Sequence, residues 1–174
     1  MKRIWVSPED CIANHTCWTP ETLKRYTYEY GNGDEVLVES ILKDPNVSIV
    51  DKMYIVDITD MLSDEDSHWL AVDYAGHALT KHTIAGKVSL NIKAEWIKGQ
   101  ISDAQLLEAE KDAWHEAKTY PKSKAAAFAC KKDPKLALRG ASAFAGGWYG
   151  EAVDPIEKQW QWERMLERLE DTDE

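Results

Sequence analysis

The chain has 174 residues, of which 44% are hydrophobic and 8 are Trp, so it can bury a core and is expected to form a single helical domain over residues 1–174. Its formal net charge of −10 argues against direct nucleic-acid binding, because neutralising phosphates requires a basic surface. The 3 cysteines do not suggest a disulfide scaffold, and neither a signal-peptide pattern nor an apolar run of about 20 residues is present, so we expect a cytoplasmic protein without membrane contact.

The N-terminal part carries one strand signal and is then dominated by helix signals. The run "KRIWV" predicts one short strand, and a helix follows from a cap at Thr19 to a stop at Gly31 or Gly33. A further helix is predicted between the Asp34 cap and Pro45 in "GDEVLVESILKDP".

Two more helices are predicted before the middle of the chain. In "SIVDKMYIVDITDML", Ser48 and Asp51 form a capping box. The β-branched residues leave a strand open there, although length and period favour a helix. The next segment, "DEDSHWLAVDYAGHAL", is apolar around most of its circumference except near Asp73 and His77, so this helix is expected to be largely buried.

A joint is predicted near the middle of the chain, around a short helix from about Ser89 to Lys98. It separates a possible acidic half, 1–87, from an alanine-rich half, 88–174. Three glycines mark the breaks: Gly76, Gly86 and Gly99.

The second half contains the clearest helix signals. In "SDAQLLEAEKDAWHEAKTY", Ser102 and Gln105 form a capping box. One apolar stripe follows: Leu106, Leu107, Ala109, Ala113, Trp114, Ala117 and Tyr120. The segment "DPKLALRGASAFAGGWYG" has small residues on two sides, which suits a central helix with close neighbours.

The last helix is predicted to begin in "DPIEKQW", with Asp154 as the cap, Pro155 at the first helical position and Glu157 completing a capping box. Together these segments predict an all-α fold, a compact bundle of about seven or eight short helices with one short N-terminal strand.

Charge is distributed unevenly along the chain. Residues 29–73 contain twelve acids and two lysines, a net charge of −10, whereas residues 118–139 have a net charge of +6. An acidic face of this kind can steer a basic partner, including a protein surface that normally binds nucleic acid, although simple solubility also explains it. The acidic interface candidates are Glu35, Glu39, Asp57, Asp60, Asp64, Glu65 and Asp66.

Two segments contain cysteines that are candidates for metal binding or thiol chemistry. Cys11, His15 and Cys17 lie within seven residues and are weak candidates for a zinc site, but their spacing matches no known zinc motif, so ordinary packing and capping roles are favoured. Cys130 lies among lysines that could lower the pKa of its thiol, but no base accompanies it and a packing role is favoured. The sequence therefore predicts no metal site and no cofactor.

Three charged or titratable residues stand out on the predicted helices. Asp73 and His77 are four residues apart, as a carboxylate and an imidazole acting together would require, but a surface ion pair gives the same pattern. Glu110 lies at the centre of an apolar stripe and needs a partner, either a Lys or Arg from a neighbouring helix or an interface.

The closing helix has two apolar sides. Trp162, Met165 and Leu169 form one stripe, and Trp160 points the other way. Either both rings are covered within one fold, or the Trp162 stripe is an apolar patch for a partner or a second copy, as in a homodimer.

From "AEWIKGQISDAQLLEAEKDAWHEA" through the alanine-rich helices to "EKQWQWERMLERLE", the chain resembles the alanine-rich helical phage proteins and the immunity proteins of polymorphic toxin systems. The shared motifs include a Gly-x-Ile-Ser junction, here Gly99 to Ser102, and a closing "WQ" followed by Arg and large apolar residues; the upstream "CWTPETLKRYTYEYGNGDEV" is similar in outline. The resemblance implies a helical, non-enzymatic phage or mobile-element protein that binds another protein in the bacterial host cytoplasm.

Three functional hypotheses follow. The first is a small acidic protein that inhibits a host defence component or neutralises a toxin by binding it. The second is a small enzyme that uses Asp73 and His77 or a Cys/His site. The third is a virion or assembly component that self-associates through its small-residue helices.

Overall fold

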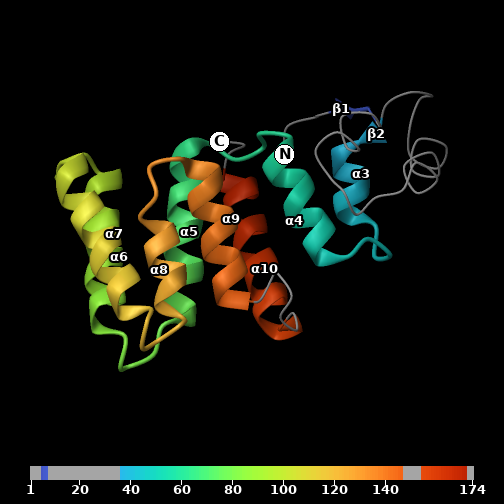
Figure 1. The fold of residues 1–174 in the computed structure, drawn as a ribbon. Coiled ribbons are helices and arrows are strands. Elements are labelled where there is room, and N and C mark those ends of the chain that lie inside the picture. The colour runs from blue at the N-terminus through green and yellow to red at the C-terminus, as the bar shows by residue number, and fades with distance from the viewer. Residues whose placement is uncertain (1–4, 8–35, 147–153, 172–174) are drawn as a thin grey trace. The chain divides into compact units, whose positions relative to one another are not determined.

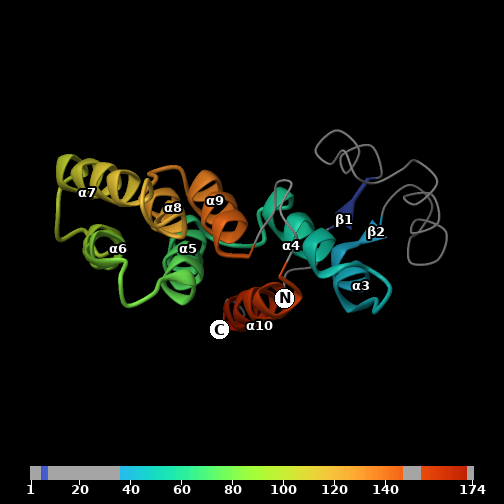
Figure 2. The same cartoon turned by 60° about the horizontal axis from the view of Figure 1, so that its bottom comes forward.

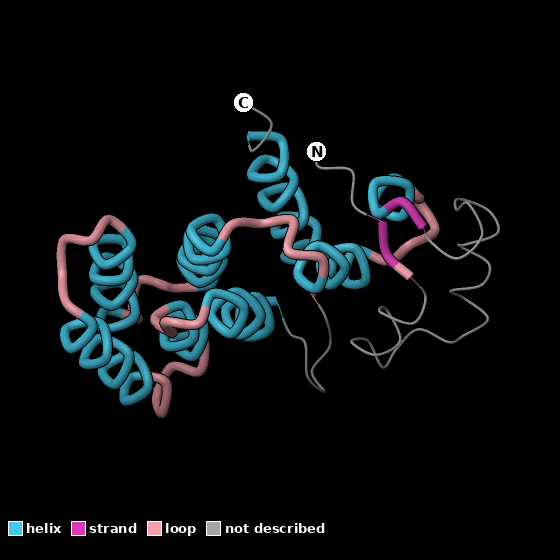
Figure 3. The backbone as a smooth tube through the Cα atoms, turned by 90° about the horizontal axis from the view of Figure 1, so that it is seen from above, coloured by secondary structure: helices cyan, strands magenta, loops and turns pink. Residues whose placement is uncertain are grey.

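The structure is a computed structural model that describes residues 5–7, 36–146 and 154–171. Within these residues the chain forms eight α-helices and two strands of two residues each, which confirms the all-α fold (Figure 1; Figure 3). The predicted helix after Thr19 lies outside the described residues.

The chain divides into two compact units. One contains residues 1–62 and 166–174, and the other contains residues 63–165. The units do not follow the expected halves, 1–87 and 88–174, because the glycine-marked joint lies inside the second unit, where Gly86 is a helical residue.

The first unit begins with a small antiparallel ladder. Strand β1 (Trp5–Val6) pairs with β2 (Val36–Leu37), with Trp5 opposite Leu37. The predicted N-terminal strand is therefore present. The helix expected from Asp34 begins only at Val38, because the preceding Val and Leu, which suit a pleated strand, pair with β1 instead.

Two helices complete the described part of this unit. They are α3 (Val38–Lys43) and α4 (Ile49–Ile58), so the second segment is a helix and not a strand. Ser48 caps α4 by accepting a hydrogen bond of 3.1 Å from the backbone N–H of Asp51. The core residues of these helices include Val38, Ile41, Met53, Ile55 and Val56.

The second unit contains the longer helices, arranged in two layers. Figure 2 shows α7, α8 and α9 side by side in one row, with α6 and α5 in a second row. The helices are α5 (Asp64–Ala78), α6 (Ile84–Ile97), α7 (Asp103–Glu116), α8 (Ser123–Ala129), α9 (Pro134–Gly146) and α10 (Pro155–Asp171), of which α10 belongs to this unit as far as Met165.

Small residues allow α8 and α9 to pack closely. The alanines of α8 and the inner alanines of α9 are buried, as the sequence predicts for a central helix. Gly140 of α9 is the tightest point, since a Cβ there would lie 2.1 Å from Cδ1 of Phe128 on α8. A side chain at this position is therefore incompatible with the present placement of the Phe128 ring.

Burial on α7 follows the predicted stripe except at its edges. Leu106, Ala109, Ala113 and Ala117 are buried. Leu107 and Tyr120 are exposed, because Leu107 lies on the flank of the helix and Tyr120 lies beyond its end. The predicted Ser102 and Gln105 capping box is present in full.

Helix α6 starts at Ile84, five residues before the expected Ser89, because a distant carboxylate caps it. Thr83 provides no side-chain cap. Instead, Glu116 at the end of α7 accepts hydrogen bonds from the backbone N–H groups of Ala85 (2.9 Å) and Gly86 (2.8 Å), and from Ser123 Oγ (2.7 Å) at the start of α8. One carboxylate thus joins three helices.

The electrostatic environment of Glu116 favours its ionised form. Burial alone would raise the pKa of this carboxyl, but the hydrogen bonds from Ser123 and from the backbone of residues 84–86 outweigh burial and hold the pKa below its usual value. The negative charge also lies at the positive end of the α6 dipole.

We expect Glu116→Gln to lower the free energy of unfolding by about 1 to 2 kcal/mol at pH 7, because charge-assisted hydrogen bonds are lost. Since the folded pKa is depressed, the contribution is complete above pH 4.5 and is lost as the pH falls further. Urea unfolding at pH 7 and pH 3.5 measures both effects. Glu95→Gln, at an exposed position of α6, is the control, and an equal loss in both variants would contradict the assignment.

Candidate functional site: a buried polar network of α5, α9 and α10

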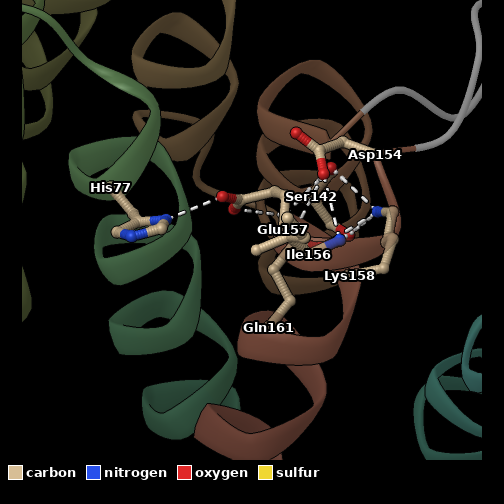
Figure 4. A network of polar contacts seen from close by, with 7 residues as sticks. All are labelled: His77, Ser142, Asp154, Ile156, Glu157, Lys158 and Gln161. Atoms are coloured by element: carbon tan, nitrogen blue, oxygen red, sulfur yellow. Dashed lines mark hydrogen bonds and ion pairs between the residues drawn. The ribbon is translucent and has the colours of Figure 1, made fainter.

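One buried cation of the second unit is the Lys158 ammonium, which lies in the first turns of α10 with only 2% of the residue exposed. Its Nζ donates hydrogen bonds to the backbone oxygen of Ser142 (3.0 Å), to Ser142 Oγ (2.9 Å) and to Gln161 Oε1 (3.0 Å) (Figure 4). Protein oxygens from α9 and α10 therefore replace water around the charge.

The network continues from Lys158 to α5 through side chains that bond in sequence. Ser142 Oγ donates to Gln161 Oε1 (2.7 Å), and Gln161 Nε2 donates to Glu157 Oε1 (2.9 Å). Glu157 Oε2 lies 2.7 Å from Nδ1 of His77 on α5, as Figure 4 shows. Tyr74 links α5 to α10 directly, since its hydroxyl donates to the backbone oxygen of Gln161 (2.8 Å).

Local sequence places this network at the start of α10. Asp154 Oδ1 accepts from the backbone N–H groups of Ile156 (3.0 Å) and Glu157 (3.2 Å), which confirms the predicted cap. The predicted capping box is wrong, because Glu157 bonds to His77 and Gln161 and the Asp154 N–H donates to the Gly146 oxygen (3.0 Å).

Gly146 makes room for the network. A Cβ at this position would lie 3.0 Å from Glu157 Cγ and 3.1 Å from Lys158 Cε. The missing side chain lets both stems pass close to the end of α9, so the small residue there contributes to the geometry of the polar groups.

Burial sets the electrostatics of the network. Removal from water lowers the pKa of the Lys158 amine to about 8, and the charge of Glu157 opposes this shift only in part. Burial likewise raises the pKa of Tyr74 well above its ordinary value, with help from Asp73 and Glu157, so Tyr74 stays a neutral donor.

A serine hydroxyl beside a lysine amine of lowered pKa is an arrangement that some hydrolases use for nucleophilic attack. Here Ser142 has 2% of its surface exposed, and its hydroxyl donates to Gln161 while accepting from Lys158. A substrate cannot reach the hydroxyl in this arrangement. The network serves to hold α5, α9 and α10 together.

Asp73 and His77 are bound to different partners. Asp73 Oδ2 accepts from Arg164 Nε (2.8 Å), and His77 contacts Glu157 and stacks on the Trp160 ring with centroids 3.9 Å apart. Both contacts lead to α10. The geometry matches structural pairing and offers no joint acid–base site between these two residues.

The two tryptophans of α10 are both covered to a large extent. Trp162, Met165 and Leu169 have 7%, 1% and 1% of their surface exposed, so the interpretation of this stripe as a free apolar patch is wrong. Trp160 is half-buried, stacks on His77 and meets the Tyr74 ring edge-on, and both of these residues belong to α5. The helix has apolar contacts on two sides, which explains the closely spaced pair.

The acidic interface candidates differ in exposure. The prediction that Asp57 lies at an interface surface is wrong, because Asp57 is buried on α4. Glu39 is half-buried and pairs with Lys43, and Glu35 lies outside the described residues. The remaining candidates are exposed or, for the last, half-buried: Asp60, Asp64, Glu65 and Asp66.

The structure describes Cys130 but not the other two cysteines. Cys11, His15 and Cys17 lie outside the described residues, and within those residues no group of three or more His, Cys, Asp or Glu could hold a metal ion. Cys130 is buried, and burial raises the pKa of its thiol to about 12 although Lys93 and Lys131 partly oppose the shift. The packing role for Cys130 is the correct one.

Glu110 has the partner that the sequence requires. Lys131, just after α8, forms an ion pair with it, and Trp114 Nε1 donates to the same carboxylate (3.3 Å). The first of the two alternatives for Glu110, pairing with a cation from a neighbouring segment, is confirmed.

A second buried cluster, which the sequence does not predict, lies around Lys93 and His68. Lys93 is fully buried, donates to the Lys131 backbone oxygen (2.8 Å) and lies 3.9 Å from the centroid of Trp96. The His68 ring meets the same Trp96 edge-on, and its Nδ1 has no hydrogen-bond partner among the described residues. Burial and the charge of Lys93 lower the pKa of His68 to about 4.

A sequence signal for the buried lysines did exist. Lys158 precedes Trp162 by four residues and Met165 by seven, so it continues their stripe, and Lys93 shares a face with Ser89 and Leu90. A lysine on an apolar stripe ordinarily extends its charged end to water, so this pattern alone does not predict that either ammonium is buried.

Comparison of the chain with protein families, with curated proteins and with solved structures gave no match. In the part of the chain that the structure describes, no helix combines the length and the apolar character needed to cross a membrane.

We expect the wild-type protein to gain stability relative to Lys158→Met as the pH rises from 7.5 to 10. The folded state binds the Lys158 proton less tightly than the unfolded chain, so the cost of the buried charge disappears between about pH 8 and 10.5. The gain corresponds to about 2 kcal/mol. Urea unfolding at both pH values measures it, with Lys87→Met as the exposed control; a constant difference would contradict the burial argument.

His68 gives a pH dependence of the same direction in a lower pH range. Its folded pKa of about 4 lies below the ordinary 6.5, so its contribution to stability is complete above pH 6.5 and is lost as the pH falls towards 4. We expect the wild type to lose about 2 kcal/mol more than His68→Phe between pH 7 and 4.5. Thermal or urea unfolding gives the difference, and exposed His115→Phe should behave as the wild type does.

Proposed function

We propose that the protein acts by binding another protein, as a small acidic inhibitor of phage or mobile-element type. Its target is a host defence component or, if the chain is an immunity protein, a toxin. The observation that carries the proposal is the first turn of α5, where Asp64 and Glu65 are exposed. Exposed carboxylates of this kind steer a basic partner surface, such as one that binds nucleic acid.

The local geometry separates the carboxylates that stabilise α5 from those that face solvent. Ser63 caps the helix by accepting from the Asp66 N–H (3.0 Å), and Ser63 Oγ donates to Asp66 Oδ2 (2.6 Å). Within the described residues, Glu65 accepts one long bond, of 3.3 Å, from Trp69 Nε1. Asp64 and Glu65 are therefore the members of this turn best placed for a partner.

A second observation supports a binding role: the side chains that an enzyme hypothesis would use are bonded to other side chains of the fold. Within the described residues, Asp73 is held by Arg164, His77 by Glu157, and Ser142 by Gln161 and Lys158. Each contact links two helices of the second unit, so these side chains stabilise the packing of the helices.

The proposal is tested by affinity capture from a lysate of the natural host with the tagged full-length chain. We expect one protein to be retained at low salt, to be released as salt rises, and to lose its own activity when mixed with the purified chain at equal concentration. Binding of the purified partner is then compared between wild type and Asp64→Asn/Glu65→Gln, for which we expect about a tenfold weaker affinity from two lost charge contacts.

The matched control is Glu95→Gln/Asp112→Asn, which removes two exposed carboxylates from α6 and α7. Melting temperatures are compared in parallel, because charges in the first turn of a helix stabilise it by about 0.3 to 1 kcal/mol each. Equal affinity of the α5 variant and the control, or retention of nothing at low salt, would refute the proposal.

A further inference from the structure

Three aromatic rings form a row across α7, α8 and α9, the helices that Figure 2 shows side by side. The Trp114 and Phe128 rings meet edge to face with centroids 5.4 Å apart, and Phe128 stacks on Phe144 at 5.0 Å with an interplanar angle of 15°. Trp114 and Phe128 are half-buried, and Phe144 is 39% exposed. One aromatic surface therefore spans three helices.

Two exposed leucines extend this surface. Leu136 is 46% exposed and lies four residues before Gly140, the residue against which Phe128 packs. It is therefore one turn from Gly140 along α9, in the direction opposite to Phe144. Leu107 is 53% exposed and lies two turns before Trp114 on the same flank of α7. We refer to Leu107, Trp114, Phe128, Leu136 and Phe144 as the α7–α9 face. Scattered apolar residues are ordinary on a protein surface, but a connected set suggests a contact site.

One end of the α7–α9 face carries uncompensated positive charge. Lys124 Nζ lies 5.4 Å from the Phe144 centroid, Lys118 lies one turn beyond Trp114, and Lys122 is exposed at the start of α8. No carboxylate within the described ranges forms an ion pair with these three lysines. At the other end, by contrast, Lys131 and Lys132 are paired with acidic side chains of α7.

We propose that the α7–α9 face binds an acidic amphipathic segment of another protein. Apolar side chains of that segment pack on Phe144, Phe128 and Leu136, and its carboxylates reach Lys118, Lys122 and Lys124. The charge complementarity is the reverse of that at the first turn of α5, so this contact goes beyond the proposed function and does not depend on it.

The ring geometry distinguishes a protein segment from a nucleic acid. Binding of single strands relies on aromatic rings with a free face on which bases stack. Phe128 and Phe144 cover each other, and Lys124 lies over the Phe144 ring, so the stacking faces are largely occupied. The exposed leucines and the exposed part of Phe144 suit apolar side chains.

The test uses three synthetic helical peptides of equal length as probes, built from Leu and Glu, from Leu and Lys, and from Ser and Glu. Each labelled peptide is titrated into the full-length protein. We expect the Leu/Glu peptide to bind at least about tenfold more tightly than either of the others, and to weaken in 0.5 M salt, because both apolar contact and opposite charge are required.

Variants of the protein then locate the contact. Lys118→Glu/Lys124→Glu and Leu136→Ser should each weaken Leu/Glu binding at least about tenfold, whereas Lys87→Glu, at an exposed position of α6, should not. Leu136 is chosen because it is substantially exposed and its replacement leaves the stacked rings in place. Capture of the partner proposed for Asp64 and Glu65 should be unchanged in the lysine variant, which separates the two proposals.

Several results would overturn this inference. They are equal binding of the Leu/Lys peptide, no binding of the Leu/Glu peptide, and Leu/Glu binding that the lysine and leucine variants leave unchanged. Tight binding of a single-stranded oligonucleotide that is lost in the same variants would assign the face to nucleic acid. Self-association of the wild type that Leu136→Ser abolishes would assign it to a second copy of the chain.

Discussion

A lysine ammonium that has lost nearly all contact with water must be solvated by protein oxygens, and at Lys158 these come from two helices. The backbone and hydroxyl of Ser142 and the amide of Gln161 surround the charge, and the chain of hydrogen bonds through Glu157 reaches His77 on α5. Removing a single partner would leave a buried charge poorly compensated, which is far more costly than losing an ordinary surface contact. The positions of α5, α9 and the first part of α10 are therefore mutually dependent.

Glu116 links the other helices of this unit, α6, α7 and α8, by hydrogen bonds to one carboxylate. Its carboxylate caps α6, belongs to α7 and accepts from the start of α8. Much of the surrounding core is alanine, which buries little apolar area per residue and leaves many helix arrangements close in energy. Polar groups with directional requirements select one arrangement among them, so the charges of Lys158 and Glu116 complement the small-residue packing.

Local signals were sufficient for the parts of the fold that local interactions decide. The caps at Ser48, Ser102 and Asp154 and the helices that follow them were predicted from a few neighbouring residues. The errors came from partners far along the chain. Helix α3 starts late because β1 pairs with β2, α6 starts early because Glu116 caps it, and Glu157 leaves its capping box for His77. The polar network and the aromatic row depend on such distant contacts and could not be read from sequence spacing alone.

The recess at Gly140 also determines how α8 can move along α9. The Phe128 ring occupies a space that exists only at a residue without a side chain, and the positions one turn away on the same side of α9 are Leu136 and Phe144. A slide of one turn, about 5.4 Å, would therefore drive the ring into a bulky side chain in either direction. The fit of Phe128 at Gly140 therefore opposes a one-turn slide of α8 along α9, and with it a change in how Phe128 and Phe144 are aligned.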